Sequence, residues 1–275
     1  MKNHTLLFLS LFLLFNSCTS DSENAMANGG KEKGMFEGKS IVDLTHDFSD
    51  ETVYWVTAKE FELDTVAFGE TEKGYFYSAF NISTAEHGGT HIDAPIHFAR
   101  DRQSVDEIPL DRLMGSAIKI DLTDKAKDNP DYQVTVADLE KWESDHDQKI
   151  PDGSIVLLET GFAAHYPDKM TYLGTCERGH SALDKMHFPG LSPEAASWLV
   201  ENRNIKSIGL DTPSIDYGQS TDFQSHVILL SENIPAFENL TNLDQLPGQG
   251  FDVIALPMKI KGGSGGPLRI VALVD

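Results

Sequence analysis

Residues 86–98 read EHGGTHIDAPIHF and concentrate the chemistry of the chain in one short segment. The segment holds three of the ten histidines, His87, His91 and His97, together with Asp93. Imidazole nitrogens and carboxylate oxygens are the ligands that zinc prefers, and manganese accepts the same mixture. A single histidine near glycine is usually a surface or packed residue, but this array predicts a metal or catalytic site.

The glycines and the proline of this segment argue against a regular helix. Gly88 and Gly89 separate the first two histidines, and Pro95 closely follows the aspartate. The helical H-E-x-x-H pattern of zincins is also absent, because residue 88 is glycine. We predict a tight glycine turn that leaves a strand and lets the ligand-type side chains converge around an ion.

The chain around this segment predicts a mixed α/β fold in a single domain, residues 39–275. Short apolar runs bounded by glycine, proline or aspartate indicate buried strands. Thr135 can cap a helix that runs to about residue 144, and Ser192 with Pro193 can open another that runs to about residue 202. The expected strands are residues 40–44, 60–68, 75–82, 117–122, 154–159, 207–210, 253–256 and 268–274.

Residues 1–17 are typical of a signal peptide. After a positive start, residues 6–15 are apolar apart from one serine and are too short to cross a bilayer as a helix. Ser17 followed by Cys18 resembles the lipobox of bacterial lipoproteins, with ordinary cleavage or retention of the signal as alternatives. We expect an exported protein held at a membrane by lipid on Cys18, with a polar tether over residues 18–38.

Charge and cysteine content exclude two further classes. The 43 acidic residues outnumber the 22 Lys and Arg residues, and a net charge of -21 opposes binding to nucleic acid. Only two cysteines are present, so lipid on Cys18 would leave Cys176 without an intrachain partner and the fold without a disulfide. Cys176 is either an incidental residue or a nucleophile, and a lone cysteine in a loop favours the first.

The sequence from residue 87 to residue 98 resembles the H-x-G-T-H-x-D-x-P-x-H signature of the cyclase-type metal hydrolases, which include bacterial kynurenine formamidase and isatin hydrolase. Other segments resemble this family as well, and together they cover about residues 40–275. They are VDLTH at 42–46, residues 153–161, HFPGLS at 187–192, GLDTPSID at 209–216, His226 with ENL at 238–240, and GGSGGP at 262–267.

The resemblance implies a swivelling β/β/α domain that assembles as a homodimer or homotetramer. It also implies a site for one or two divalent ions, zinc or manganese, with Asp93 able to bridge them and His97 as the catalytic histidine. Without the resemblance, His226 would be interpreted as a packed histidine and Glu238 as a solvated side chain. The implied metal ligands are His87, His91, Asp93, His226 and Glu238.

Several aromatic side chains near these motifs could shape a pocket for a flat substrate. The alternative is that they belong to the core, and His187 could contact either the substrate or a metal-bound water. The substrate-binding candidates are Trp55, Phe76, Phe80, His187 and Phe188.

The sequence therefore predicts a metal-dependent hydrolase that cleaves an amide C–N bond in a small molecule. The substrate would be an aryl formamide such as N-formylkynurenine or a cyclic amide such as isatin, attacked by metal-bound hydroxide with His97 as general acid and base. The lipoprotein-like leader departs from the cytoplasmic habit of kynurenine formamidase, which puts a role in tryptophan and kynurenine catabolism in doubt. The alternatives are a dehydratase or lactonase on the same scaffold, and a non-catalytic lipoprotein that binds a metal or a small molecule.

Overall fold

The structure, a computed structural model, describes residues 36–275, and their compact unit runs from Gly38 to Asp275. The predicted signal peptide, Cys18 and the tether up to residue 35 lie outside the described residues. Among the helices of residues 36–275, none has the length and apolar character needed to span a bilayer.

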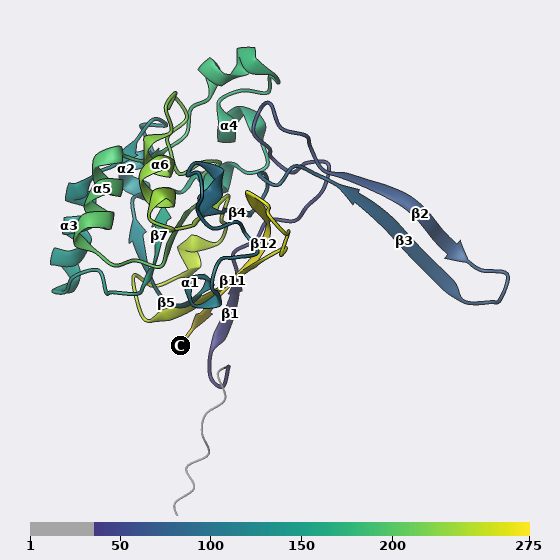
Figure 1. Ribbon diagram of the computed structural model, residues 1–275, viewed down its shortest axis with the longest axis horizontal. Coiled ribbons are helices and arrows are strands. Elements are labelled where there is room, and N and C mark those ends of the chain that lie inside the picture. Colours follow the sequence, from purple (N-terminus) through teal and green to yellow (C-terminus); the bar gives the residue numbers. More distant parts are fainter. Residues whose placement is uncertain (1–35) are drawn as a thin grey trace, which may run out of the picture. The chain divides into compact units, whose positions relative to one another are not determined.

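An eight-stranded mixed sheet forms the centre of the unit (Figure 1). Strands β5, β7, β9 and β10 run parallel, whereas β1, β4, β11 and β12 pair antiparallel with their neighbours. Because β4 pairs with both β10 and β12, the sheet closes on itself. The spatial order is β1 (Ser40–Asp43), β12 (Gly265–Val274), β11 (Phe251–Pro257), β5 (Met114–Asp121), β7 (Ile155–Glu159), β9 (Ser207–Leu210), β10 (Ala236–Glu238) and β4 (His91–Asp93).

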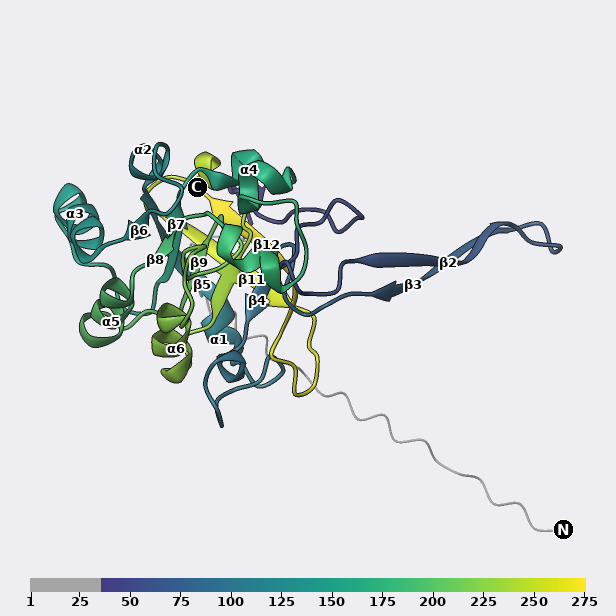
Figure 2. The ribbon, with the colours of Figure 1, turned by 90° about the horizontal axis from the view of Figure 1, so that it is seen from above.

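Helices α3, α5 and α6 cover the outer face of the parallel strands (Figures 1 and 2). Helix α3 begins with a capping box between Thr135 and Asp138, and α5 begins with Pro193 after Ser192, whose hydroxyl accepts a hydrogen bond from the Ala195 N–H. The α-helices are α1 (Leu110–Leu113), α2 (Thr123–Ala126), α3 (Val136–His146), α4 (Lys169–Leu173), α5 (Pro193–Asn202) and α6 (Gln224–Ser231). The 3-10 helices are η1 (Pro95–His97), η2 (Phe162–His165), η3 (His180–Lys185) and η4 (Leu243–Gln245), and a small parallel pair joins β6 (Gln133–Val134) to β8 (Gly190–Leu191).

Strand β7 shows why the central strands are continuously apolar. Ile155 and Leu157 belong to the core enclosed by the closed sheet, whereas Val156 and Leu158 pack against the helices. All four side chains are fully buried, as expected for a parallel strand covered on both faces. The two apolar clusters together fix the positions of the strand ends that carry the site.

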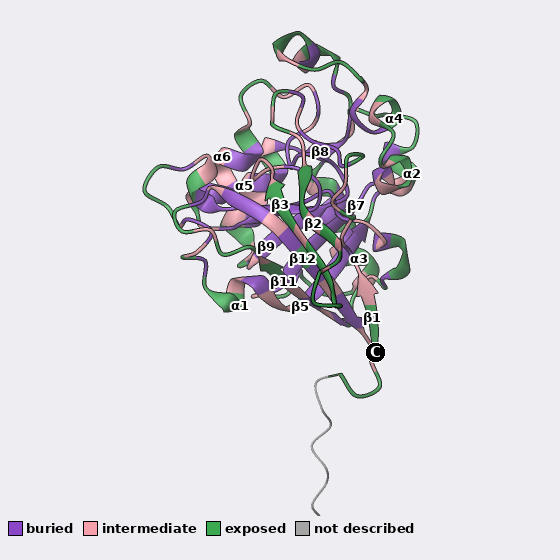
Figure 3. Ribbon diagram, turned by 90° about the vertical axis from the view of Figure 1, so that its right-hand side faces the viewer, coloured by how far each residue is buried: buried purple, intermediate pink, exposed green. Residues whose placement is uncertain are grey.

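A long antiparallel hairpin, β2 (Glu62–Glu70) with β3 (Phe76–Ser83), extends away from this body (Figure 1). Figure 3 shows both of its strands as largely exposed, in contrast to the buried central sheet. Phe68 packs edge-on against Phe76 and lies beside Phe80, so the hairpin has a small aromatic cluster of its own.

The prediction of a mixed α/β domain with flanking helices is confirmed. Each of the eight expected strands and both expected helices is present, with ends that differ by a few residues at most. The elements that the sequence did not indicate are short, notably β4, β10 and α6. Three-residue strands offer too little alternation to be recognised from sequence.

Candidate metal centre

A glycine turn places the first ligand-type side chains at the base of a pocket. At Gly88 a Cβ atom would lie 2.0 Å from Cδ1 of Tyr54, so only glycine fits there. Gly89 has a φ of +55°, the left-handed region that favours glycine. The chain then enters β4, where His91 and Asp93 are two residues apart and share one face of the strand. Both side chains are buried.

Sheet register explains how Glu238 reaches this site from a distant part of the sequence. In the antiparallel pair of β4 and β10, Glu238 lies directly opposite His91. The His91 Nε2 atom lies 3.3 Å from Oδ1 of Asp93 and 3.4 Å from Oε2 of Glu238. Since cross-strand neighbours on one face are in contact, the register alone brings these side chains together.

His226 enters from the first turn of α6 and completes the group. Its Nε2 atom lies 2.9 Å from Oδ2 of Asp93 and 3.2 Å from Oε1 of Glu238. His226 and Glu238 are 3% exposed, so the contacts form away from bulk water. Four of the five side chains that the resemblance implied as ligands, namely His91, Asp93, His226 and Glu238, therefore meet at one place.

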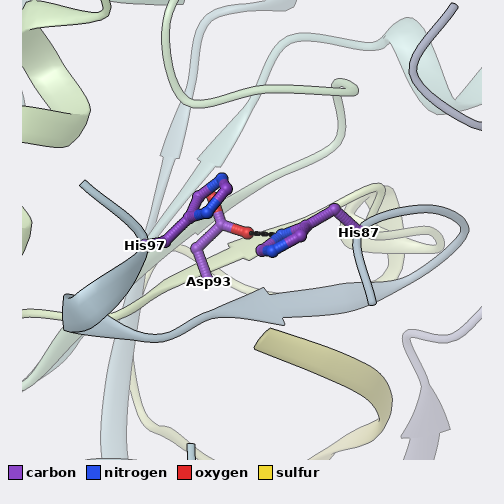
Figure 4. A group of neighbouring side chains, drawn as sticks. All are labelled: His87, Asp93 and His97. Atoms are coloured by element: carbon purple, nitrogen blue, oxygen red, sulfur yellow. Dashed lines mark hydrogen bonds and ion pairs between the residues drawn. The ribbon is translucent and has the colours of Figure 1, made fainter. Parts of the chain in front are cut away.

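His87 and His97 lie on the open side of Asp93. The His87 Nδ1 atom is 2.7 Å from Oδ1 of Asp93, and its ring stacks on that of His97 with centroids 3.8 Å apart (Figure 4). The other ring nitrogen of His87 is 2.9 Å from the Ser264 hydroxyl, which donates a hydrogen bond to Glu86. The loop of residues 262–267 thus supports His87 through Ser264.

The electrostatics of the group suit a divalent cation. Burial and the neighbouring charge of Asp93 raise the pKa of Glu238. Burial also acts to raise the pKa of Asp93, but the surrounding imidazoles, led by His87, outweigh it and hold this pKa well below its usual range. Two buried carboxylates at close range repel each other, and a cation between them would relieve that repulsion.

The donor set also fits such an ion. His91 donates its Nδ1 proton to the Gly89 carbonyl at 2.9 Å, which leaves Nε2 free to coordinate. Potential ligand atoms lie within 4.8 Å of one another in two groups, His87–Asp93–His97 and His91–Asp93–Glu238. Because Asp93 belongs to both groups, the arrangement accommodates one ion or a bridged pair, and three imidazoles with two carboxylates suit zinc or manganese.

The group forms one wall of a cavity of about 290 Å³. Its other walls are largely apolar, and Trp55 and Phe98 both lie close to Phe223. The lining residues beside the candidate ligands and His97 are Val53, Tyr54, Trp55, Ala58, Gly88, Phe98, Pro213, Ser214, Phe223 and Asn239. A site of this form can bind a flat apolar molecule against the charged group.

The structure places only one of the five substrate-binding candidates on the wall of this cavity. Trp55 lines it, whereas Phe188 is fully buried behind the wall with its ring edge-on to Trp55. Phe76 and Phe80 do not line it, because β3 runs outward along the hairpin, where they are 53% and 42% exposed. His187 is also outside the cavity and pairs with Asp131 at 2.8 Å on the surface.

Several residues of the site were missed by reasoning from sequence. Phe98 follows His97 directly, and Asn239 follows Glu238, so their neighbours in sequence offered a signal. Asp216 ends the segment 209–216 that resembles the family, yet its bond to His226 is visible only in the structure. Phe223 had no such signal, because its position depends on the turn that precedes α6.

Both the sequence and the fold are similar to those of known proteins. The family described as putative cyclase matches residues 42–217. Isatin hydrolase A from Labrenzia aggregata, solved bound to benzyl benzoate, is 35% identical with a TM-score of 0.78, over 86% of this chain and 94% of that one. Isatin hydrolase A from Ralstonia solanacearum is 33% identical with a TM-score of 0.77, over 86% and 92%.

A kynurenine formamidase from Salinibacter ruber is 28% identical over 84% of this chain and 96% of its own length. The family match spans the segment with His87, His91, Asp93 and His97. With more than half of its length matched to the family, the chain belongs to the cyclase family.

Proposed function

We propose that this protein is a metal-dependent hydrolase that cleaves an amide C–N bond in a flat aromatic substrate. A cyclic amide such as isatin is the leading substrate, and an aryl formamide such as N-formylkynurenine is the next. One observation carries the proposal: five ligand-type side chains line one cavity whose other walls are largely apolar. The names of the isatin hydrolase and kynurenine formamidase relatives support amide chemistry.

The ligands would hold zinc or manganese through His87, His91, Asp93, His226 and Glu238. When bound, such an ion polarises a carbonyl group and lowers the pKa of a water molecule. The buried carboxylates would hold the ion, while the aromatic side chains of the wall would seat the ring of the substrate and keep bulk water away from it.

His97 is the proposed acid and base. Burial lowers its pKa to about 4, so the imidazole is neutral near pH 7 and can accept a proton from the attacking water. Its ring lines the cavity and stacks on His87, which keeps it beside the ligand group. The same ring can then return the proton to the leaving nitrogen.

The test is elemental analysis of the purified protein together with turnover of isatin, N-formylkynurenine and an aryl lactone of matched size. We expect about one or two equivalents of zinc or manganese and hydrolysis of at least one amide. Bound metal with turnover of the lactone alone would replace the proposal by a lactonase. Bound metal with no turnover of any compound would favour the non-catalytic binder.

We also infer that the protein is exported and carries lipid on Cys18, and that it assembles as a homodimer or homotetramer. Both inferences come from the sequence and its resemblance to the family. Incorporation of a fatty-acid analogue that Cys18→Ser abolishes would support the first. Light scattering of the purified protein measures the second, and a monomer would contradict it.

A further inference from the structure

Helix α6, which carries the ligand His226, begins without a cap of its own. Its N-cap residue is Phe223, whose φ of +50° lies in the left-handed region and whose side chain has no atom that can accept a hydrogen bond. The first N–H groups of a helix need acceptors when they are buried. In α6 these groups include those of Ser225 and His226, both of which are buried.

Asp216 supplies the missing acceptor from outside the helix. Its Oδ1 atom accepts a hydrogen bond from the Ser225 N–H at 3.0 Å, and its Oδ2 atom accepts one from the His226 N–H at 3.1 Å. Asp216 is 2% exposed, so the carboxylate lies inside the fold. A residue outside the helix thus fixes the turn that carries the ligand.

The same carboxylate also holds the imidazole of His226. Oδ2 of Asp216 is 2.6 Å from Nδ1 of His226, a short contact that is typical of a charge-assisted hydrogen bond. With an ion bound and the proton on Nδ1, the Nε2 lone pair would be available on the side of Asp93 and Glu238. A proton on Nε2 would instead leave no lone pair on that side of the ring for an ion.

We propose that Asp216 is a positioning residue for the metal centre, which fixes both the backbone turn and the ring tautomer of His226. This inference rests on the proposed function, since it assigns Asp216 a role toward the proposed ion. His91 shows the same arrangement with a neutral acceptor, because its Nδ1 proton goes to the Gly89 carbonyl. Outer acceptors of this kind raise metal affinity by orienting the ligand.

The test is Asp216→Asn, which keeps the size of the side chain but removes its charge and one acceptor atom. We expect zinc affinity, measured by competition with a chromophoric chelator, to fall about 10- to 100-fold. The matched control is Asp168→Asn, because Asp168 caps α4 through the N–H groups of Met170 and Thr171, and among residues 36–275 its side chain is bonded to no histidine. The control should bind zinc as the wild type does.

A spectroscopic measurement separates positioning from a merely structural cap. In the zinc-loaded wild type, ¹⁵N NMR should show His226 protonated on Nδ1 and coordinated through Nε2. This measurement needs no variant, so it stands even if Asp216→Asn fails to fold. Coordination through Nδ1, or unchanged zinc affinity in a folded Asp216→Asn protein, would overturn the inference. A wild type that binds no metal would instead overturn the proposed function.

Discussion

The metal centre encloses His226, and a ring stack on Tyr166 encloses His46. The two surroundings shift the pKa of the histidine in opposite directions. At the metal centre, burial opposes the charge of His226, but hydrogen bonds to Asp216, Asp93 and Glu238 raise its pKa well above the usual value. At the stack, the His46 ring lies 3.6 Å from that of Tyr166, and burial lowers its pKa to about 4. Its Nε2 atom is buried and has no hydrogen-bond partner among the described residues.

The difference shows that burial by itself lowers the pKa of a histidine, whereas buried carboxylates beside the ring raise it. A histidine in an apolar stack stays neutral and packs like an aromatic residue. Three carboxylates around a histidine stabilise positive charge at that place, whether a proton or a metal ion supplies it. The number of acidic neighbours, more than the depth of burial, therefore separates a ligand from a packed residue.

Removing the shared carboxylate should have the largest effect. Asp93→Asn takes away the side chain that belongs to both candidate ligand groups. We expect metal affinity to fall by more than about 100-fold and amide turnover to disappear with it, since ligands matter more than their outer partners. Elemental analysis after dialysis and a turnover assay measure both effects. A variant that keeps its full metal content would show that Asp93 is not a metal ligand.

His97 offers an intermediate case, because it lies beside the carboxylates and yet has a pKa of about 4. His97→Gln should retain the metal while turnover falls about 10²- to 10⁴-fold, as expected for loss of a general acid and base. The exposed His187 is a suitable control position, and His187→Gln should change turnover less than about twofold. Full turnover in His97→Gln would remove this residue from the mechanism.

Burial of His46 in the stack should make the free energy of unfolding depend on pH. The pKa of His46 is about 4 in the folded protein and about 6.5 in the unfolded chain. Its contribution to the free energy of unfolding is therefore complete above pH 6.5 and is lost as the pH falls toward 4. Between pH 7 and pH 4.5 this loss amounts to about 2 kcal/mol. His46→Phe keeps a ring in the stack and should remove this part of the slope. If the free energy of unfolding falls with pH equally steeply in the variant and in the wild type, the lowered pKa of His46 is contradicted.

The smallest effects concern two aromatic residues, one on the wall of the cavity and one on the hairpin. Trp55→Ala removes one wall of the cavity, and we expect KM for an aromatic amide to rise about tenfold with kcat little changed. Phe76 is exposed on the hairpin, so Phe76→Ala should leave KM within about twofold. Steady-state kinetics of the two variants tests whether the cavity seats the substrate. Equal effects at both positions would contradict that role.

The helices and strands with strong local signals could be predicted from the sequence. The apolar runs that form β5, β7 and β9 lie between turn residues, and the capping residues before α3 and α5 mark where those helices begin. The segment 86–98 also indicated a metal or catalytic site, because glycines and ligand-type side chains lie close together in the sequence. These features depend on neighbours a few residues apart, and the sequence records them directly.

The family resemblance had already implied His226 and Glu238 as ligands, but how distant residues reach the site could be seen only in the folded domain. Glu238 is opposite His91 through a sheet register between two three-residue strands, and Asp216 holds His226 through a turn without regular pattern. Phe76 looked like a pocket residue because it is near the motif in sequence, but the hairpin carries it away. Register and chain direction are set by packing across the whole domain, so no local pattern encodes them.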